Sequence, residues 1–202
     1  METRKKIIRL ALGNFLTYGI RAVTMDEIAR LSGVSKKTIY EEFSSKEELV
    51  NAAIEAIICD YKCDLDEMEA MDDSAIDHLF GMTRYLRETF TSMNPLLMQE
   101  IQRFYPNCWQ KVNEFKTEKV LRNIIMVLDQ GKQSGDFRKE INSELLALMR
   151  MDQITNTFFT NYSNADSSFL DCQLAILDHF IHGILTDQGR SNYYKKLQTQ
   201  EF

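Results

Sequence analysis

Residues 24–49 read TMDEIARLSGVSKKTIYEEFSSKEEL, and this stretch decides the fold of the N-terminal part of the chain. Thr24 with Glu27 fits the S/T-x-x-E capping box, which predicts that a short helix covers residues 24–32. Gly33 follows this helix, and a short turn with glycine lets the next helix cross it steeply. The stretch is therefore patterned as a pair of short, crossing helices.

The second short helix is predicted over residues 35–42, with Ser35 as its N-cap. Ile39 and Phe43 form its apolar face. Four polar positions in its first turns point elsewhere: Lys36, Lys37, Thr38 and Tyr40. In a helix-turn-helix, the first turns of the second helix enter the major groove of DNA. The pattern therefore predicts a helix-turn-helix whose polar side faces DNA.

Two longer helices flank this pair. Residues 4–18 repeat apolar side chains at helical spacing, and Gly19 is a plausible end of that helix. Ser44 with Glu47 fits another capping box, which predicts a helix from there through about Met68.

Two helix starts are suited to phosphate binding. The hydroxyl of Thr24 and the free backbone N–H groups beside it can hold one phosphate. Lys46 lies in the first turn of the next helix, where the helix dipole favours acidic residues. A second phosphate partner explains a lysine at that position.

The stretch from Ile7 to Leu49 resembles the DNA-binding domain of the tetracycline-repressor (TetR) family of bacterial regulators. The residues that carry the resemblance are Ala11, Phe15, Gly19, Thr24, Ile28, Ala29, Gly33, Val34, Ser35, Thr38, Ile39, Tyr40, Phe43, Lys46, Glu47, Glu48 and Leu49. The resemblance implies that residues 24–32 position the module and residues 35–42 read the DNA. Together with the pattern above, it makes the candidate DNA-binding residues Thr24, Ser35, Lys36, Lys37, Thr38, Tyr40 and Lys46.

Glu41 and Glu42 depart from the commonest form of the family, in which many members carry a histidine or an asparagine before the phenylalanine. Two carboxylates beside this helix would repel DNA phosphates. We therefore expect both to face away from the DNA, and the pair argues against DNA contacts C-terminal to Tyr40.

The charge of the chain changes near residue 50. Residues 1–50 carry nine Lys and Arg against seven Asp and Glu, a net of +2, and the remainder carries fifteen against twenty-three, a net of −8. The predicted organisation is a helix-turn-helix domain over residues 1–49, a helical effector-binding and dimerisation domain over 50–189, and a polar tail over 190–202 that is a short helix or disordered.

An all-α fold is expected throughout. The 202 residues contain only two prolines and eight glycines, which suits long helices, and no strand-like alternation or repeat occurs. Beyond the first four helices, the sequence predicts five more, over residues 74–92, 95–105, 107–134, 142–162 and 167–187. The segment GKQSGDF is the predicted turn after the third of these.

The resemblance implies that the C-terminal region forms a homodimer through its last two long helices. The candidate interface residues are Leu145, Leu148, Phe158, Leu174, Leu177 and Ile181. Dimerisation has a physical motive, because two half-sites one DNA turn apart multiply the specificity of one recognition helix.

Aromatic and methionine side chains are dense around residues 101–115. They form the apolar core of the helices or line a pocket there, and a ligand of that pocket would be a small apolar or aromatic effector. The candidate ligand-binding residues are Tyr85, Phe104, Tyr105, Trp109 and Phe115.

A metal site and a redox site are weaker alternatives. His179 and His182 lie three residues apart after Asp178, a possible spacing for metal ligands, although no third convincing ligand lies near. Cys59 and Cys63 share a helix face, which suits neither a disulfide nor a complete zinc site. Neither a metal nor a cofactor is therefore expected.

The remaining composition narrows the compartment and the class. No apolar run approaches the roughly 20 residues that cross a bilayer, the N-terminus lacks the cleavage site of a secretory signal, and four scattered cysteines are typical of free thiols. We expect a cytoplasmic protein without a membrane partner. The signatures of common enzyme classes, such as G-x-S-x-G, a P-loop or H-E-x-x-H, do not occur.

The sequence therefore predicts a sequence-specific DNA-binding transcriptional regulator, a ligand-responsive repressor that binds a double-stranded operator as a homodimer. The alternative is a DNA-binding adaptor or architectural protein whose C-terminal domain binds a protein instead of a small ligand. An enzyme is the third and least supported class.

Overall fold

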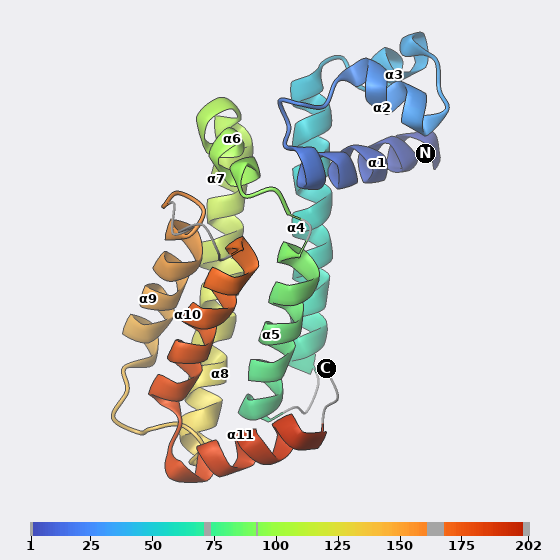
Figure 1. Cartoon of the computed structure of the whole chain (residues 1–202). Helices are drawn as coiled ribbons and strands as arrows, with labels where there is room; N and C mark the ends of the chain where they lie inside the picture. Colours follow the sequence, from blue (N-terminus) through green and yellow to red (C-terminus); the bar gives the residue numbers. More distant parts are fainter. Residues whose placement is uncertain (1, 71–73, 92, 161–167, 200–202) are drawn as a thin grey trace. The chain divides into compact units, whose positions relative to one another are not determined.

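The computed structural model describes residues 2–70, 74–91, 93–160 and 168–199, and within these the regular elements are helices (Figure 1). They are α1 Glu2–Tyr18, α2 Met25–Ser32, α3 Lys36–Glu42, α4 Lys46–Ala70, α5 Ala75–Phe90, α6 Leu96–Phe104, α7 Pro106–Phe115, a π-helical turn Lys116–Val120, α8 Leu121–Ser134, α9 Ser143–Asn156, α10 Phe169–Ile184 and α11 Asp187–Thr199. The predicted all-α class is confirmed.

The chain divides into two compact units. Unit 1 comprises Met1–Asp64 and Ser92–Phe115, and unit 2 comprises Leu65–Thr91 and Lys116–Phe202. The helix-turn-helix therefore shares a unit with the first part of α4 and with α6 and α7, which lie far along the sequence.

Unit 1 is built around the apolar faces of its helices. Ile7, Ala11 and Phe15 come from α1, and they join Ile28 and Ile39 from the two short helices in one buried core. The same core contains three buried side chains from α6 and α7: Leu97, Ile101 and Cys108. The later helices thus complete the hydrophobic core of the N-terminal module.

Local signals explain the short helices of unit 1. Thr24 and Glu27 form the predicted capping box at the start of α2. Gly33 ends α2 with φ of 69°, a left-handed conformation that favours glycine. Ser35 caps α3, with its hydroxyl accepting a hydrogen bond from the Thr38 N–H at 3.0 Å.

The predicted cap of α4 is wrong by one residue. The Glu48 N–H donates to the Ser45 hydroxyl at 3.2 Å, and the Glu48 carboxylate accepts from the Ser44 N–H at 2.8 Å. Ser45 therefore caps the first turn of α4, and the Glu48 carboxylate reaches back to Ser44, one residue before the cap. The sequence SSKEE offers both registers, and the structure uses the later one.

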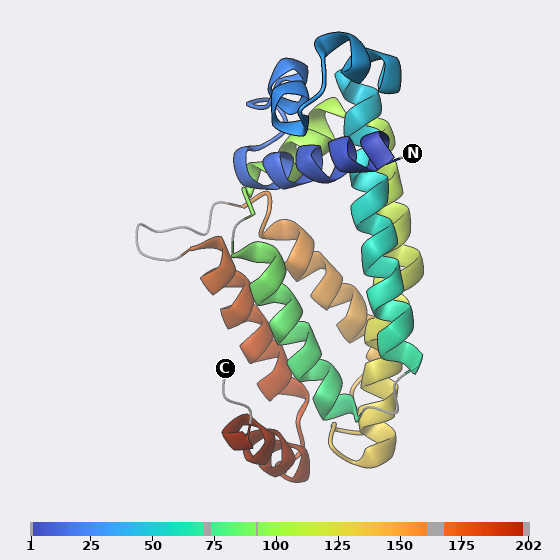
Figure 2. The same ribbon diagram turned by 90° about the vertical axis from the view of Figure 1, so that its right-hand side faces the viewer.

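Unit 2 is a helical bundle in which α5, α8, α9 and α10 run alongside one another, with α11 across one end (Figure 1, Figure 2). At the C-terminal end of α5, the rings of Phe90, Phe158 and Phe169 form an aromatic cluster. Tyr193 of α11 stacks on Phe80 of α5, with ring centroids 4.9 Å apart. The C-terminal segment after Gly189 is thus helical as far as Thr199 and packs on the bundle.

Other predicted boundaries shift in the structure. The single helix expected over residues 107–134 is interrupted by the π-helical turn Lys116–Val120. The helix expected over 142–162 ends at Asn156, and the last two residues of that prediction lie outside the described residues. Within the described ranges, no helix is both long enough and apolar enough to cross a membrane.

Candidate DNA-binding site

The site is the polar side of α2 and α3. Ile39 is fully buried and anchors α3 on the core of unit 1, whereas Tyr40 keeps 44% of its surface exposed. Lys36 and Lys37 are exposed as well, and Thr38 is half-buried. One side of α3 therefore fixes the helix, and the other side offers two amines, a hydroxyl and a phenol to a partner.

Lys36 is held by an acidic side chain of the preceding helix. Its amine lies 2.8 Å from the Asp26 carboxylate, and this hydrogen bond raises the pKa of Lys36 above its usual value. Both groups are exposed, so DNA phosphates can compete with Asp26 for the amine. Asp26 thus links α2 to α3 across the Gly33 turn.

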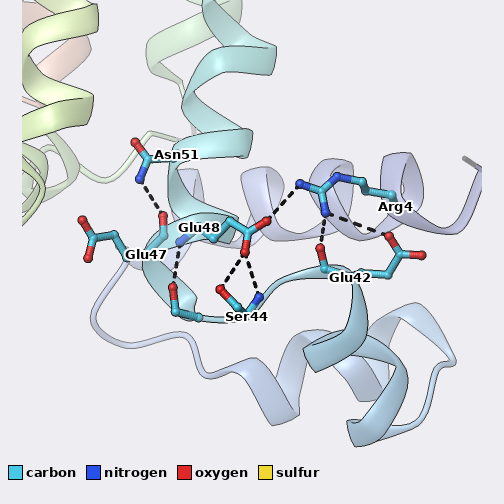
Figure 3. A network of polar contacts seen from close by, with 7 residues as sticks. Arg4, Glu42, Ser44, Glu47, Glu48 and Asn51 are labelled. Carbon is cyan, nitrogen blue, oxygen red and sulfur yellow. Dashed lines mark hydrogen bonds and ion pairs between the residues drawn. The ribbon is translucent and has the colours of Figure 1, made fainter.

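Glu41 and Glu42 have different surroundings. Glu41 is exposed and lies 3.6 Å from the amine of Lys37, one turn earlier on α3. Glu42 belongs to a polar network with α1, because the Arg4 guanidinium donates to the Glu42 carbonyl and lies 4.0 Å from its carboxylate (Figure 3). Arg4 also lies 4.0 Å above the Phe43 ring. The charge of Glu42 is therefore partly neutralised by α1, and that of Glu41 by Lys37.

The start of α4 is part of the same network. Glu48 accepts hydrogen bonds from the Ser44 N–H and hydroxyl and from Arg4, whose Nη2 lies 3.3 Å away (Figure 3). The bonds from Ser44 hold the pKa of Glu48 below its usual value. The network fastens the loop after α3 between α1 and α4, which fixes where α3 presents its polar side.

Lys46 is the first residue of α4 and is half-buried. Burial lowers the pKa of its amine, and the nearby Glu100 carboxylate opposes that effect. The lysine therefore lies in the first turn, as predicted, and an acidic group of α6 contributes to its electrostatic environment.

Glu100 is a residue that sequence reasoning missed. Its carboxylate accepts hydrogen bonds from the backbone N–H groups of Ile20 at 2.6 Å and Arg21 at 3.2 Å. The Asn94 N–H donates to the Leu16 carbonyl at 2.7 Å beside it. The unpaired N–H groups after Gly19 are a signal that an acceptor is needed, but the acceptor lies some eighty residues away in sequence.

The candidate ligand-binding residues are distributed over both units. Tyr105 and Trp109 are half-buried and pack against the core of unit 1, and Phe104 is exposed beside the guanidinium groups of Arg21 and Arg103. Phe115 is the last residue of α7 and is half-buried. Tyr85 lies in unit 2, also half-buried.

The candidate dimer residues differ in exposure. Leu145 and Leu148 on α9 are 54% and 52% exposed. Leu174 is half-buried, and three of the candidates are buried within unit 2: Phe158, Leu177 and Ile181.

Histidine and cysteine side chains form no metal cluster in the described part of the chain, where no group of three His, Cys, Asp or Glu side chains is placed to hold an ion. His182 lies 3.5 Å from Asp178 on the same helix. The thiols of Cys59 and Cys63 are exposed and are not joined in a disulfide, and burial raises the pKa of the Cys108 thiol to about 11.

Comparison with known proteins gives a consistent picture. Residues 7–53 match the family model of the bacterial regulatory proteins of the tetR family. The HTH-type transcriptional regulator YvaF of Bacillus subtilis is 26% identical over 170 residues, which cover 82% of this chain and 87% of that protein. The HTH-type transcriptional repressor KstR2 of Mycobacterium tuberculosis is 24% identical over 147 residues, covering 71% and 73%.

Solved structures share the fold. A putative transcriptional regulator from Saccharomonospora viridis, in complex with choline, superimposes with a TM-score of 0.73 at 19% identity, over 92% of this chain and 98% of that one. Reduced NemR of Escherichia coli superimposes with a TM-score of 0.74 at 16% identity, over the same shares.

Proposed function

We propose that the chain is a regulator of the TetR family, whose model its residues 7–53 match, and that it is a ligand-responsive repressor that binds its operator as a homodimer. The observation that carries the proposal is the two-sided α3, buried at Ile39 and exposed at Tyr40. Such a helix can enter the major groove without disturbing the core that holds it. The proposed DNA contacts are Thr24, Ser35, Lys36, Lys37, Thr38, Tyr40 and Lys46.

A homodimer is proposed through α9 and α10. Leu145, Leu148 and Met149 expose about half of their surface on one helix, and an exposed apolar face of this kind supports a protein interface. The proposed interface also includes Leu174, whereas Phe158, Leu177 and Ile181 support it from within the bundle.

A small apolar or aromatic effector is proposed to control DNA binding. Such an effector acts by binding more tightly to a conformation in which the two α3 helices no longer match adjacent major grooves. The proposed ligand contacts are Tyr85, Phe104, Tyr105, Trp109 and Phe115.

Selection of DNA tests the proposal directly. The full chain is mixed with a library of random double-stranded DNA, and bound molecules are amplified and sequenced over several rounds. We expect a pseudo-palindrome whose half-sites lie about 10 base pairs, or a multiple of one helical turn, apart. Recovery of unrelated sequences after the last round would overturn a sequence-specific function.

A further inference from the structure

Arg150 is a fully buried arginine in the interior of unit 2. It lies on α9 with 0% of its surface exposed, and it is the largest of the fully buried side chains of the described residues. None of its three guanidinium nitrogens has a hydrogen-bond partner within the described part of the chain. A buried, hydrogen-bond-rich cation without a partner is rare in folded proteins, because such groups are normally paired.

The charge of Arg150 is not neutralised by the helices around it. Burial lowers the pKa of the guanidinium to about 10, so the group still carries its proton at neutral pH. None of the described acidic side chains offsets this effect. The ring of Phe180 on α10 lies close to Arg150, with its centroid 6.0 Å from the guanidinium carbon. A ring at that distance compensates little of the lost hydration.

Arg150 also shares the bundle interior with amide groups that lack partners. Among the described residues, no hydrogen bond reaches Nδ2 of Asn123 on α8, Oε1 of Gln153 on α9 or Oε1 of Gln173 on α10. The other end of the Gln173 amide donates to the Thr157 hydroxyl and to the Ile154 carbonyl. Each of the three helices α8, α9 and α10 therefore carries a buried amide atom without a hydrogen-bond partner among the described residues.

The contacts show how far apart these groups lie along the bundle. Gln173 contacts Thr157, whereas Phe180 approaches Arg150, so α9 and α10 run antiparallel there. The seven residues from Gln173 to Phe180 span about 10 Å of helix. Arg150 and Gln173 thus lie about two helical turns apart along the bundle, a span that one small molecule can bridge.

A purely structural role does not account for Arg150. A structural buried arginine is stabilised by carboxylates or carbonyls that satisfy its fork of donors. The buried neighbours of Arg150 along α9 are instead Ala147, one turn earlier, and Met151, the next residue. An apolar residue of similar volume would suit these surroundings better than a cation.

We propose that Arg150 is the anion-binding residue of an effector site inside unit 2, and that the effector is a small monocarboxylate with an apolar or aromatic body. The inference rests on the proposed function as a ligand-responsive regulator and assigns the charged group of the effector to Arg150. Of the ligand contacts proposed above, only Tyr85 belongs to the same unit as Arg150. A carboxylate pairs with both arms of a guanidinium. One negative charge neutralises Arg150, whereas a phosphate dianion would leave a buried charge uncompensated. The unpaired amides supply further donors and acceptors for a polar substituent.

Ligand entry is coupled to a change in the bundle. Arg150 has no exposed surface in this conformation, so a carboxylate can reach it only if the helices around it move apart. The ligand therefore binds a conformation different from this one, and such differential affinity is what an allosteric effector requires. The same cation excludes positively charged effectors from the site.

The test measures thermal stability of the full chain with matched pairs of compounds at millimolar concentration. The carboxylates are hexanoate, octanoate, decanoate, benzoate and indole-3-acetate, each beside its own primary amide, with decyl phosphate and choline as further probes. We expect at least one carboxylate to raise the melting temperature, and its amide and choline to leave the temperature unchanged. Stabilisation by decyl phosphate alone would overturn the carboxylate assignment, and no stabilisation by any anion would overturn the site.

Variants connect the response to Arg150. Arg150→Met should weaken binding of the active carboxylate by about thirtyfold or more, the loss expected when one partner of a buried charge pair is removed. Arg150→Lys keeps the positive charge but not the two parallel N–H donors of the guanidinium, so it should lose less carboxylate affinity than Arg150→Met. Arg190→Met removes an exposed arginine of the same unit and should respond like the wild type. An unchanged response of Arg150→Met would overturn the assignment.

Ligand-free stability is a second readout. Because the guanidinium is unpaired, Arg150→Met without ligand should melt at or above the temperature of the wild type. A large loss of stability would show that Arg150 is a structural group and overturn the proposal. Binding of the DNA selected by the wild type distinguishes the DNA-binding function from the effector site. If the wild type and Arg150→Met both bind this DNA but no anion stabilises the wild type, the effector site is wrong and the DNA-binding function stands.

Discussion

The amine of Lys36 lies 2.8 Å from the carboxylate of Asp26, which joins the recognition helix α3 to the preceding helix α2. The pair fixes the position of a lysine proposed to contact DNA, and it also shares the charge of that lysine with an acid. Both side chains are more than half exposed, so phosphates and salt can compete with the pair. The strength of DNA binding should therefore depend on Asp26 as well as on Lys36.

Asp26→Asn should strengthen binding to non-specific DNA by about two- to fivefold at low salt, because it frees the Lys36 amine for phosphates. The gain should fade at high salt. Fluorescence anisotropy with a labelled duplex of arbitrary sequence measures the affinity. Asp60→Asn alters an exposed acid on α4 and is the control. Equal gains in both variants would attribute the effect to net charge alone.

Tyr40→Ala combined with Lys46→Ala should weaken operator binding by more than about tenfold, because it removes one exposed side chain of α3 and the lysine at the start of α4. Gel-shift titration at moderate salt measures the loss, and circular dichroism checks that the helices persist. Tyr18→Ala removes another exposed tyrosine of unit 1 and should bind normally. Unchanged affinity of the double variant contradicts the assigned contacts.

Glu100→Ala should lower the free energy of unfolding by about 1.5–3 kcal/mol, the range for hydrogen bonds to a charged group. The carboxylate is the acceptor for the N–H groups of Ile20 and Arg21. Urea denaturation measures the change, and Glu114→Ala alters another glutamate of the same unit as the control. A loss no larger than that of the control would mean that water replaces Glu100 at no cost.

Glu48→Gln should destabilise the protein at neutral pH and much less at low pH. The folded-state pKa of Glu48 lies below its unfolded value, chiefly because of the bonds from Ser44. The ionised form therefore stabilises the fold above the unfolded pKa of about 4.3, and this contribution is lost as the pH falls through the lower folded-state pKa. Urea denaturation at pH values from roughly 3 to 7 compares the stability of the variant with that of the wild type. Glu47→Gln is the control. A constant difference across that range would count against the ionised cap.

The helix-turn-helix could be predicted because its signals are local. The capping box at Thr24, the left-handed Gly33 and the Ser35 cap each act within four residues, and all three are observed. The cap of α4 could not be chosen in advance, because Ser44 and Ser45 each precede a glutamate at the right spacing. Glu48 is also contacted by Arg4, which lies forty-four residues earlier in the chain, and the local sequence does not show that contact.

The buried faces of the C-terminal helices could not be predicted, for a different reason. α9 carries apolar residues on more than one face, so its pattern does not show which face is buried. Leu145 and Leu148 are exposed, whereas Arg150 is buried beside Ala147. An arginine is normally placed on the surface by sequence reasoning. The packing of α5, α8, α9 and α10, and not the local sequence, decides its burial.

The central claim is that α2 and α3 bind a specific DNA sequence, and a competition measurement tests it most directly. Fluorescence anisotropy compares the wild-type affinity for the selected operator with that for a scrambled duplex of the same composition, across a series of salt concentrations. We predict that the operator binds at least about a thousandfold more tightly at physiological salt, and that the logarithm of both affinities falls linearly with the logarithm of the salt concentration. Equal affinities for the two duplexes, or binding that does not respond to salt, would contradict the account.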